Sequence, residues 1–158
     1  MSDILFDTGS GVFSYRVAGI ARRADGRVLL QRSGGDYAFI GGHVRAFETS
    51  ADALIREFRE ELGARIAVGP LMAVGELFFP WGGRRCHQLG LYYAVELTEP
   101  GRVIPDGVFH GRDEAGGERF DLDYLWVDPR RDLPVYPPQV MARLRAGGDG
   151  VMHFVYEE

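Results

Sequence analysis

Three glutamates in one short segment are spaced so that their side chains could bind a metal ion together. Glu57, Glu60 and Glu61 lie in residues 42–64, which read GHVRAFETSADALIREFREELGA. On a helix these positions are i, i+3 and i+4, so the three carboxylates share one face. Like charges at that spacing destabilise a helix by about 0.2–0.5 kcal/mol per pair. A hard divalent cation such as Mg²⁺ prefers oxygen ligands and would reverse the sign of this cost.

An acidic helix face that simply faces solvent is the alternative interpretation. Such a face is usually stabilised by Glu–Arg pairs four residues apart, but here Glu57 meets Glu61 and Glu60 meets Ala64. The apolar face of the helix is separate, so the carboxylates border it and can face a cleft. We therefore interpret the glutamates as candidate metal ligands and catalytic residues. The apolar stripe comprises Ala51, Leu54, Ile55, Phe58 and Leu62.

The whole segment resembles the signature of the Nudix hydrolase family. It has the spacing G-x5-E-x7-R-E-x-x-E-E-x-G, and it departs from the family at two aliphatic positions, Phe58 and Ala64, and at Ile40, where many members have proline. The resemblance implies an α/β/α sandwich with a mixed sheet. It also implies Mg²⁺- or Mn²⁺-dependent hydrolysis of the pyrophosphate linkage in a nucleoside diphosphate joined to another moiety. The shared positions are Gly42, Glu48, Arg56, Glu57, Glu60, Glu61 and Gly63.

The resemblance also implies roles within the segment. The metal would be bound by the carboxylates of Glu57, Glu60 and Glu61 and by the backbone carbonyl of Gly42. Arg56 and Glu48 would hold the ligand carboxylates in place, or form an ion pair that fastens the loop to the helix, and the two interpretations are compatible. A general base is also needed, either one of the same glutamates or a carboxylate of a later loop. The candidates in that loop are Asp113, Glu114 and Glu118.

Substrate contacts are predicted around the paired glycines. Arg32 ends a predicted strand, where its guanidinium could bind a phosphate or simply face solvent. Tyr37 could stack on a base or pack under the loop. Gly41 and Gly42 form a glycine loop that, beside a metal and an arginine, is suited to bridging adjacent phosphates. We therefore predict that these four residues bind the substrate.

An apolar cluster follows the signature. Phe78, Phe79, Pro80 and Trp81 precede two glycines, as expected at a turn. The cluster could form the surface of a homodimer. Some ADP-ribose-cleaving relatives have a proline about as far beyond the signature as Pro80, so ADP-ribose is one candidate for the small-molecule nucleotide substrate.

Composition narrows the classes of function. The 158 residues fit one domain, 1–158, and a net charge of −5 argues against a nucleic acid polymer as partner. All 18 basic residues are arginine, which excludes catalysis by a lysine nucleophile. The single cysteine excludes an intrachain disulfide. The first residues have no basic start or apolar run, and no segment approaches 18 apolar residues, so we expect a cytoplasmic protein that does not span a membrane.

The elements that must position these residues follow from the apolar pattern. We expect a mixed sheet with a helix on each side. The signature helix begins after Thr49 and ends at Gly63, Asp25-Gly26 forms a hairpin turn, and residues 99–120 form a loop or lid. Predicted strands span 13–21, 28–31, 37–40, 66–79, 87–97, 124–127 and 151–156, and a second helix runs from Pro137 or Pro138 to Leu144.

Two other functions are compatible with this fold. A catalytically silent nucleotide-binding or sensor module would be expected to lack the acidic triad, which is intact here. A diphosphate isomerase would need a cysteine before the glycine loop, whereas Cys86 lies after it. The sequence therefore favours the hydrolase.

Overall fold

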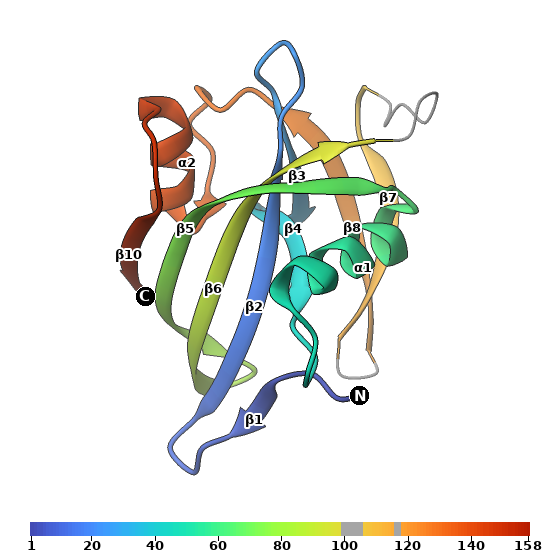
Figure 1. The fold of residues 1–158 in the computed structure, drawn as a ribbon. Helices are drawn as coiled ribbons and strands as arrows, with labels where there is room; N and C mark the ends of the chain where they lie inside the picture. Colours follow the sequence, from blue (N-terminus) through green and yellow to red (C-terminus); the bar gives the residue numbers. More distant parts are fainter. Residues whose placement is uncertain (99–105, 116–117) are drawn as a thin grey trace.

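The computed structural model describes the backbone of residues 1–98, 106–115 and 118–158, and the side chains of these residues except those of 111–121. The described strands form one ten-stranded mixed sheet with a helix on each face (Figure 1), which confirms the predicted α/β/α sandwich. The helices are α1 (Ser50–Leu62) and α2 (Pro138–Ala146). The strands are β1 (Leu5–Asp7), β2 (Val12–Ala21), β3 (Val28–Ser33), β4 (Asp36–His43), β5 (Ile66–Trp81), β6 (Arg84–Leu97), β7 (Phe109–Ala115), β8 (Glu118–Val127), β9 (Val135–Tyr136) and β10 (Met152–Glu157).

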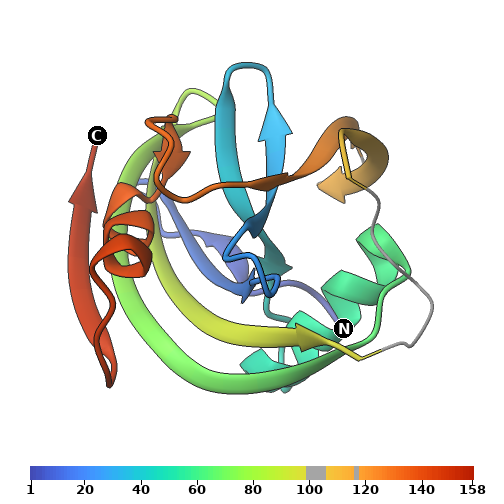
Figure 2. The same ribbon diagram turned by 90° about the horizontal axis from the view of Figure 1, so that it is seen from above.

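The sheet order is β10-β5-β6-β2-β4-β3-β8-β7, with β1 beside β2 and β9 beside β4. The β10–β5, β2–β6 and β4–β9 pairs are parallel, and the other pairs are antiparallel. β5 and β6 are the longest strands and bend through a wide arc (Figure 2). The bend gives the sheet a concave side. Neither helix in the described chain is long and apolar enough to cross a membrane.

Alternating side chains of the strands divide the core between the two helices. Ala18 and Ile20 of β2 pack in the cluster that contains the buried side of α2. Val17 and Ala21 of the same strand pack in the cluster that contains Leu54 and the rest of the buried side of α1. Successive strand residues point to opposite faces, so the two helices cover opposite faces of the sheet.

Helix α1 begins and ends where the sequence predicts. The side-chain oxygen of Thr49 accepts a hydrogen bond from the backbone N–H of Asp52 at 3.1 Å, as an N-cap does. Gly63 ends the helix in the left-handed conformation, with φ +59°. The predicted apolar stripe is wrong at one position, because Ile55 is 40% exposed. Arg56, the next residue, is buried instead, because its guanidinium forms hydrogen bonds with Glu48 and Glu57.

The turn at Asp25-Gly26 forms, but the strands around it are not the predicted hairpin pair. β4 lies between β2 and β3, and one isolated bridge, Arg22 to Val28, joins the chain across the turn. The predicted glycine loop is wrong, because Gly41 and Gly42 lie within β4 and pair with β2. Gly41 permits the close approach of the two strands. A Cβ at Gly41 would lie 1.9 Å from the carbonyl oxygen of Val17, so only a glycine lets β4 approach β2 this closely.

The predicted loop over residues 99–120 is wrong in part. β7 and the start of β8 pair as an antiparallel hairpin, and residues 99–105 and 116–117 lie outside the described residues. Charged residues suggested a loop, but backbone hydrogen bonds do not depend on side-chain type, and charged residues are common on strands at the edge of a sheet. Within β5 the pairing with β6 shifts register between Val68 and Leu71, because Pro70 cannot donate a hydrogen bond to the sheet.

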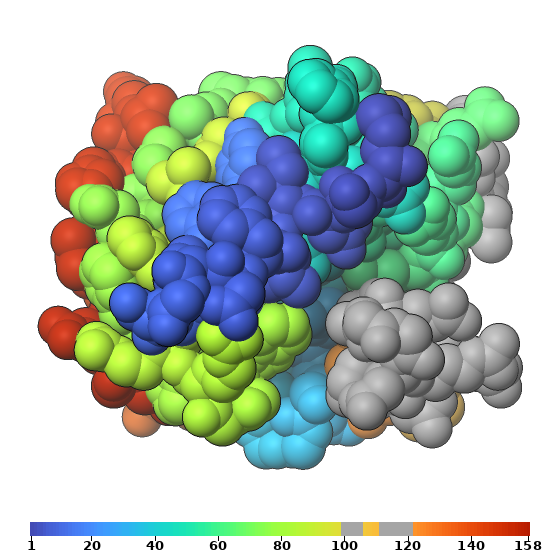
Figure 3. All heavy atoms as spheres, turned by 90° about the horizontal axis from the view of Figure 1, so that it is seen from below, coloured from blue at the N-terminus to red at the C-terminus, as the bar shows by residue number. Residues whose placement is uncertain are grey.

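The N-terminal segment lies across the end of the sheet from which α1 starts. Asp3 bridges to Arg45 in the loop before α1. Figure 3 shows these first residues, in blue, beside the turn between β5 and β6, in yellow-green. An ion pair of 2.8 Å between Asp7 and Arg84 joins the two segments. The N-terminal segment therefore connects the loop before α1 with the β5–β6 turn.

Candidate active site

Arg56 joins the loop before α1 to the helix. Its Nε and Nη2 donate to the two carboxylate oxygens of Glu48 at 2.9 and 3.0 Å, and its Nη1 donates to Glu57 Oε1 at 2.5 Å. Nη2 also donates to the backbone carbonyl of His43 at 3.0 Å. The guanidinium holds the pKa of the Glu48 carboxyl below its usual value. One arginine thus joins the loop to the helix and also contacts the candidate metal ligand Glu57. That it holds ligand carboxylates for a metal stays a prediction.

Gly42 and Glu57 are in direct contact. A Cβ built at Gly42 would lie 2.4 Å from the carboxyl carbon of Glu57 and 2.5 Å from its Oε1. The missing side chain therefore makes room for the carboxylate. This contact brings Glu57 to the edge of the concave side, although α1 covers the opposite face of the sheet.

The other two glutamates of the signature have different surroundings. The hydroxyl of Tyr124 on β8 donates to Glu61 Oε2 at 2.9 Å, and Tyr124 itself is fully buried. The Glu60 side chain is about half exposed and forms an ion pair of 3.4 Å with Arg56 Nη1, four residues before it. The expectation that this face lacks Glu–Arg pairs four residues apart is therefore wrong at Glu60. Among the described residues, no three His, Cys, Asp or Glu side chains converge as a closed metal site.

The donor chemistry of this edge fits a hard divalent cation. Glu57, Glu60 and Glu61 supply carboxylate oxygens from one helix, and Gly42 lies against the first of them. Mg²⁺ prefers such oxygen ligands and keeps several water ligands, so it does not require a closed cage of protein groups. Assignment of these residues as ligands stays a prediction.

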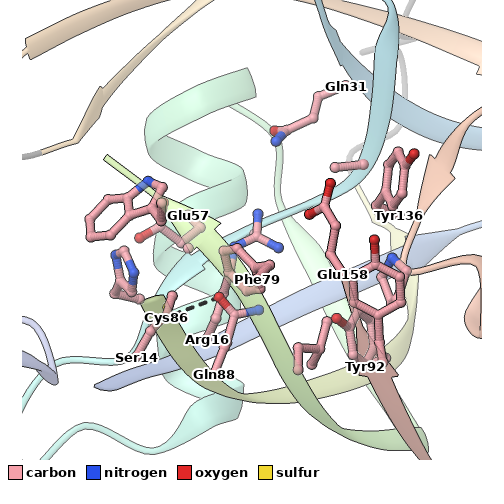
Figure 4. Close-up of a pocket in the computed structure, with 18 of the residues that line it drawn as sticks. Ser14, Arg16, Gln31, Glu57, Phe79, Cys86, Gln88, Tyr92, Tyr136 and Glu158 are labelled. Carbon is pink, nitrogen blue, oxygen red and sulfur yellow. Dashed lines mark hydrogen bonds between the residues drawn. The ribbon is translucent and has the colours of Figure 1, made fainter. Parts of the chain in front are cut away.

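A cavity of about 470 Å³ opens on the concave side, and both Gly42 and Glu57 line it. Its volume lies in the range of about 300–1,000 Å³ that is usual for small-molecule sites. Figure 4 shows Glu57 on one side, Gln31, Tyr136 and Glu158 on another, and the Arg16 side chain between them. Aromatic lining residues are Phe79, Trp81, Tyr92, Tyr136 and Tyr156.

The floor of the cavity is a row of side chains across neighbouring strands. Tyr156, Leu77, Gln88 and Ser14 follow one another in register on β10, β5, β6 and β2. The Ser14 hydroxyl donates to Gln88 Oε1 at 3.3 Å, which orients the Gln88 amide. Burial raises the pKa of Tyr92 to about 12, so its hydroxyl is neutral at pH 7. The cavity thus combines aromatic surfaces with neutral hydrogen-bonding groups.

The structure brings together some of the predicted substrate-binding residues but not others. Gly41 and Gly42 line the cavity, whereas Arg32 and Tyr37 are not among its described lining residues. Arg32 Nη2 instead donates to Asp123 Oδ2 at 2.9 Å on β8, and Tyr37 packs against the core cluster beneath α2. Their roles in substrate binding stay predictions.

The candidate general bases of the later loop lie on the β7–β8 hairpin. Asp113, Glu114 and Glu118 have a described backbone, but their side chains are outside the described residues. The base therefore stays open between these residues and the signature glutamates.

Several side chains that line the cavity could not be identified as functional from the sequence. Arg16, Gln88 and Tyr156 carry no spacing that marks them as functional. Alternation within a strand predicts that Ser14 and Arg16 share a face. No sequence feature predicts that β6 pairs with β2, or that β10 joins the same sheet beside β5. Phe79 and Trp81 of the predicted dimer cluster also line the cavity.

Comparison with known proteins agrees with this architecture. The family model of the NUDIX domain matches residues 13–141. The solution structure of the ORF135 protein of E. coli is 30% identical, with 89% of this chain and 92% of that chain covered and a TM-score of 0.51. The search among curated proteins found no significant match.

More distant structures share the fold. A MutT protein from Bacillus halodurans is 16% identical, with 91% of this chain and 89% of that chain covered and a TM-score of 0.60. An ADP-ribose pyrophosphatase from Streptococcus suis is 12% identical, with 90% and 98% covered and a TM-score of 0.57.

Proposed function

Because the chain belongs to the Nudix hydrolase family, we propose that it is a Mg²⁺- or Mn²⁺-dependent nucleotide pyrophosphatase. Its substrate would be a nucleoside diphosphate joined to another moiety, cleaved at the pyrophosphate linkage. The bound cation would neutralise charge on the phosphoryl oxygens and lower the pKa of the attacking water. Glu57, Glu60, Glu61 and the Gly42 carbonyl are the groups proposed to hold it.

The acidic edge of α1 is continuous with the nucleoside-sized cavity, and this continuity is the main support for the proposed function. Glu57 and Gly42 line the same cavity as Phe79, Tyr92 and Gln88. Aromatic rings can stack on a base, and amide groups can hydrogen-bond its edge. A nucleotide whose base enters the cavity would therefore place its phosphates at the glutamates.

Structural neighbours suggest which compounds to test first. One is described as an ADP-ribose pyrophosphatase, and another, 14% identical, as a UDP-X diphosphatase. At this identity they support the fold alone, so their substrates serve only as candidates. ADP-ribose and UDP-sugars represent the two base classes, purine and pyrimidine, that the cavity could accept.

The test is a hydrolysis panel with all products resolved. It includes ADP-ribose, UDP-glucose, dinucleoside polyphosphates, oxidised and ordinary (d)NTPs, and a phosphomonoester. We expect turnover of at least one pyrophosphate compound with millimolar Mg²⁺ or Mn²⁺ and none with excess EDTA. Preference for the monoester, or unchanged turnover in EDTA, would contradict the proposal.

The same panel separates the catalytically silent module from the enzyme. A silent module would bind a nucleotide without releasing products at any metal concentration. The intact glutamates and the Arg56–Glu48–Glu57 network favour the enzyme. A cytoplasmic location, a homodimer and the absence of a nucleic acid partner stay predictions.

A further inference from the structure

The side chain of Arg16 lines the cavity. Among the described residues it is the only one of its type that lines this space. It lies on β2, and the strand alternation places it on the same face as Ser14 and Ala18. Figure 4 shows its guanidinium in the middle of the site, between Glu57 and Glu158.

The guanidinium of Arg16 has unused donors. In the described part of the chain no carboxylate lies within ion-pair distance of it, whereas Arg56 is paired with Glu48 and Glu57, and Arg32 with Asp123. Its one described hydrogen bond, from Nη2 to the backbone carbonyl of Phe39, is long at 3.4 Å. A guanidinium carries five N–H donors.

Burial of a cation without a counter-charge costs free energy in the unliganded fold, and binding of an anionic ligand would supply the missing charge. Arg56 and Arg45, which also lie near the glycines, already form ion pairs with acidic side chains. Arg16 is therefore better placed than they are to bind an anionic ligand. On the adjacent strand β4, the residue paired with Arg16 is His43, which follows Gly42. Arg16 therefore lies beside the paired glycines of β4, at the point where the acidic edge meets the stacking and amide groups.

We propose that Arg16 binds the diphosphate of the substrate, on the phosphate that stays attached to the nucleoside. This inference rests on the proposed function and adds to it a direction of binding. Arginine suits the role because its planar fork can bind two phosphate oxygens at once. The nucleoside would lie among Tyr92, Gln88 and their neighbours, and the leaving moiety would extend past Glu57.

The alternative is that Arg16 only packs on the floor of the cavity and stabilises the fold. Its charge lies close enough to the hydroxyl of Tyr92 to oppose, in small part, the effect of burial on the Tyr92 pKa. A structural role predicts that loss of Arg16 lowers the melting temperature without a specific effect on substrate affinity. A binding role predicts the reverse.

The first experiment measures kcat and KM for Arg16→Gln and Arg16→Lys on the best substrate of the panel. Charged hydrogen bonds typically contribute about ten- to a hundredfold in affinity. We therefore expect KM to rise at least tenfold in Arg16→Gln, with a smaller change in kcat and an unchanged melting temperature. Arg16→Lys should recover part of the affinity, because it keeps the charge without the fork. Arg130→Gln, an exposed residue paired with Asp128, is the matched control and should behave as wild type.

The second experiment needs no turnover. Binding of inorganic pyrophosphate is titrated by calorimetry in EDTA, and we expect it to weaken at least tenfold in Arg16→Gln but not in Arg130→Gln. An active wild type with unchanged KM and unchanged pyrophosphate affinity in Arg16→Gln would overturn the inference. A wild type that hydrolyses nothing would refute the proposed function instead, and the titration would still test Arg16.

Discussion

Replacement of Gly42 by alanine tests whether the contact between this glycine of β4 and Glu57 matters for catalysis. The new Cβ would lie 2.4 Å from the carboxyl carbon of Glu57, about 1 Å short of the ordinary contact distance of 3.4 Å. The carboxylate must therefore move by roughly that amount. A displacement of about 1 Å in a catalytic group can lower the rate by about 10²-fold.

The same substitution should leave the fold largely intact. The atoms that must move are the end of a flexible side chain, and alanine at a compatible position restricts the unfolded chain, which stabilises a protein by about 0.4–1 kcal/mol. A change of 1 kcal/mol shifts the melting temperature of a domain of this size by roughly 2–4 °C. We expect Gly42→Ala to melt within that interval of wild type.

The assay compares kcat and melting temperature in three glycine variants. Gly35→Ala is the matched control, because nothing lies within 4 Å of its Cβ position, and it should match wild type in both measurements. Gly41→Ala should fail to fold stably, since its Cβ would meet backbone atoms of β2. A stable Gly42→Ala variant with kcat within twofold of wild type would show that this contact does not position Glu57 for catalysis.

Substitutions at three further positions test the surroundings of Glu61, the loop before α1 and the Arg56–Glu48 pair. Tyr124→Phe removes the hydroxyl that donates to Glu61, and it should raise the Mg²⁺ concentration for half-maximal activity about tenfold or more; an unchanged metal titration would contradict this role. Phe47 is 99% exposed with φ +65°, where an L-residue costs about 1–2 kcal/mol, so Phe47→Asn should raise the unfolding free energy, whereas Phe47→Ala, which keeps the strain, should not. Glu48 has a lowered pKa because of Arg56, so its ionised form stabilises the fold above the usual value of 4.5 and this stability is lost as pH falls further. The stability deficit of Glu48→Gln should therefore be present at pH 7 and shrink below pH 4.5, which melting curves against pH can measure.

Local patterns predicted the helix that carries the chemistry. The positions of Thr49 and Gly63 fix where α1 begins and ends, because both act through hydrogen bonds within a few residues. The apolar spacing fixes which side is buried, except where Arg56 displaces Ile55. The acidic edge of the site could therefore be predicted from the sequence alone.

The cavity could not be predicted in the same way, because it depends on contacts between distant strands. Tyr156 reaches the site only because β10 pairs in parallel with β5. Gln88 and Ser14 meet only because β6 lies in parallel beside β2. Period-two patterns show which residues share a face of a strand, but they do not show which strands are neighbours. The sequence therefore shows which face of its strand Arg16 shares with Ser14, but it does not show which residues surround it.

The acidic edge of α1 is proposed to perform metal-dependent hydrolysis rather than simply to face solvent. The most direct test measures kcat with Mg²⁺ and metal-free melting temperature for Glu61→Gln beside Leu54→Ala, a fully buried core position. We expect Glu61→Gln to lose about 10²-fold or more in kcat while its melting temperature holds or rises slightly. Leu54→Ala should lose about 2–5 kcal/mol of stability with less effect on turnover per folded molecule. A fully active Glu61→Gln enzyme would contradict a role of this acidic edge in catalysis.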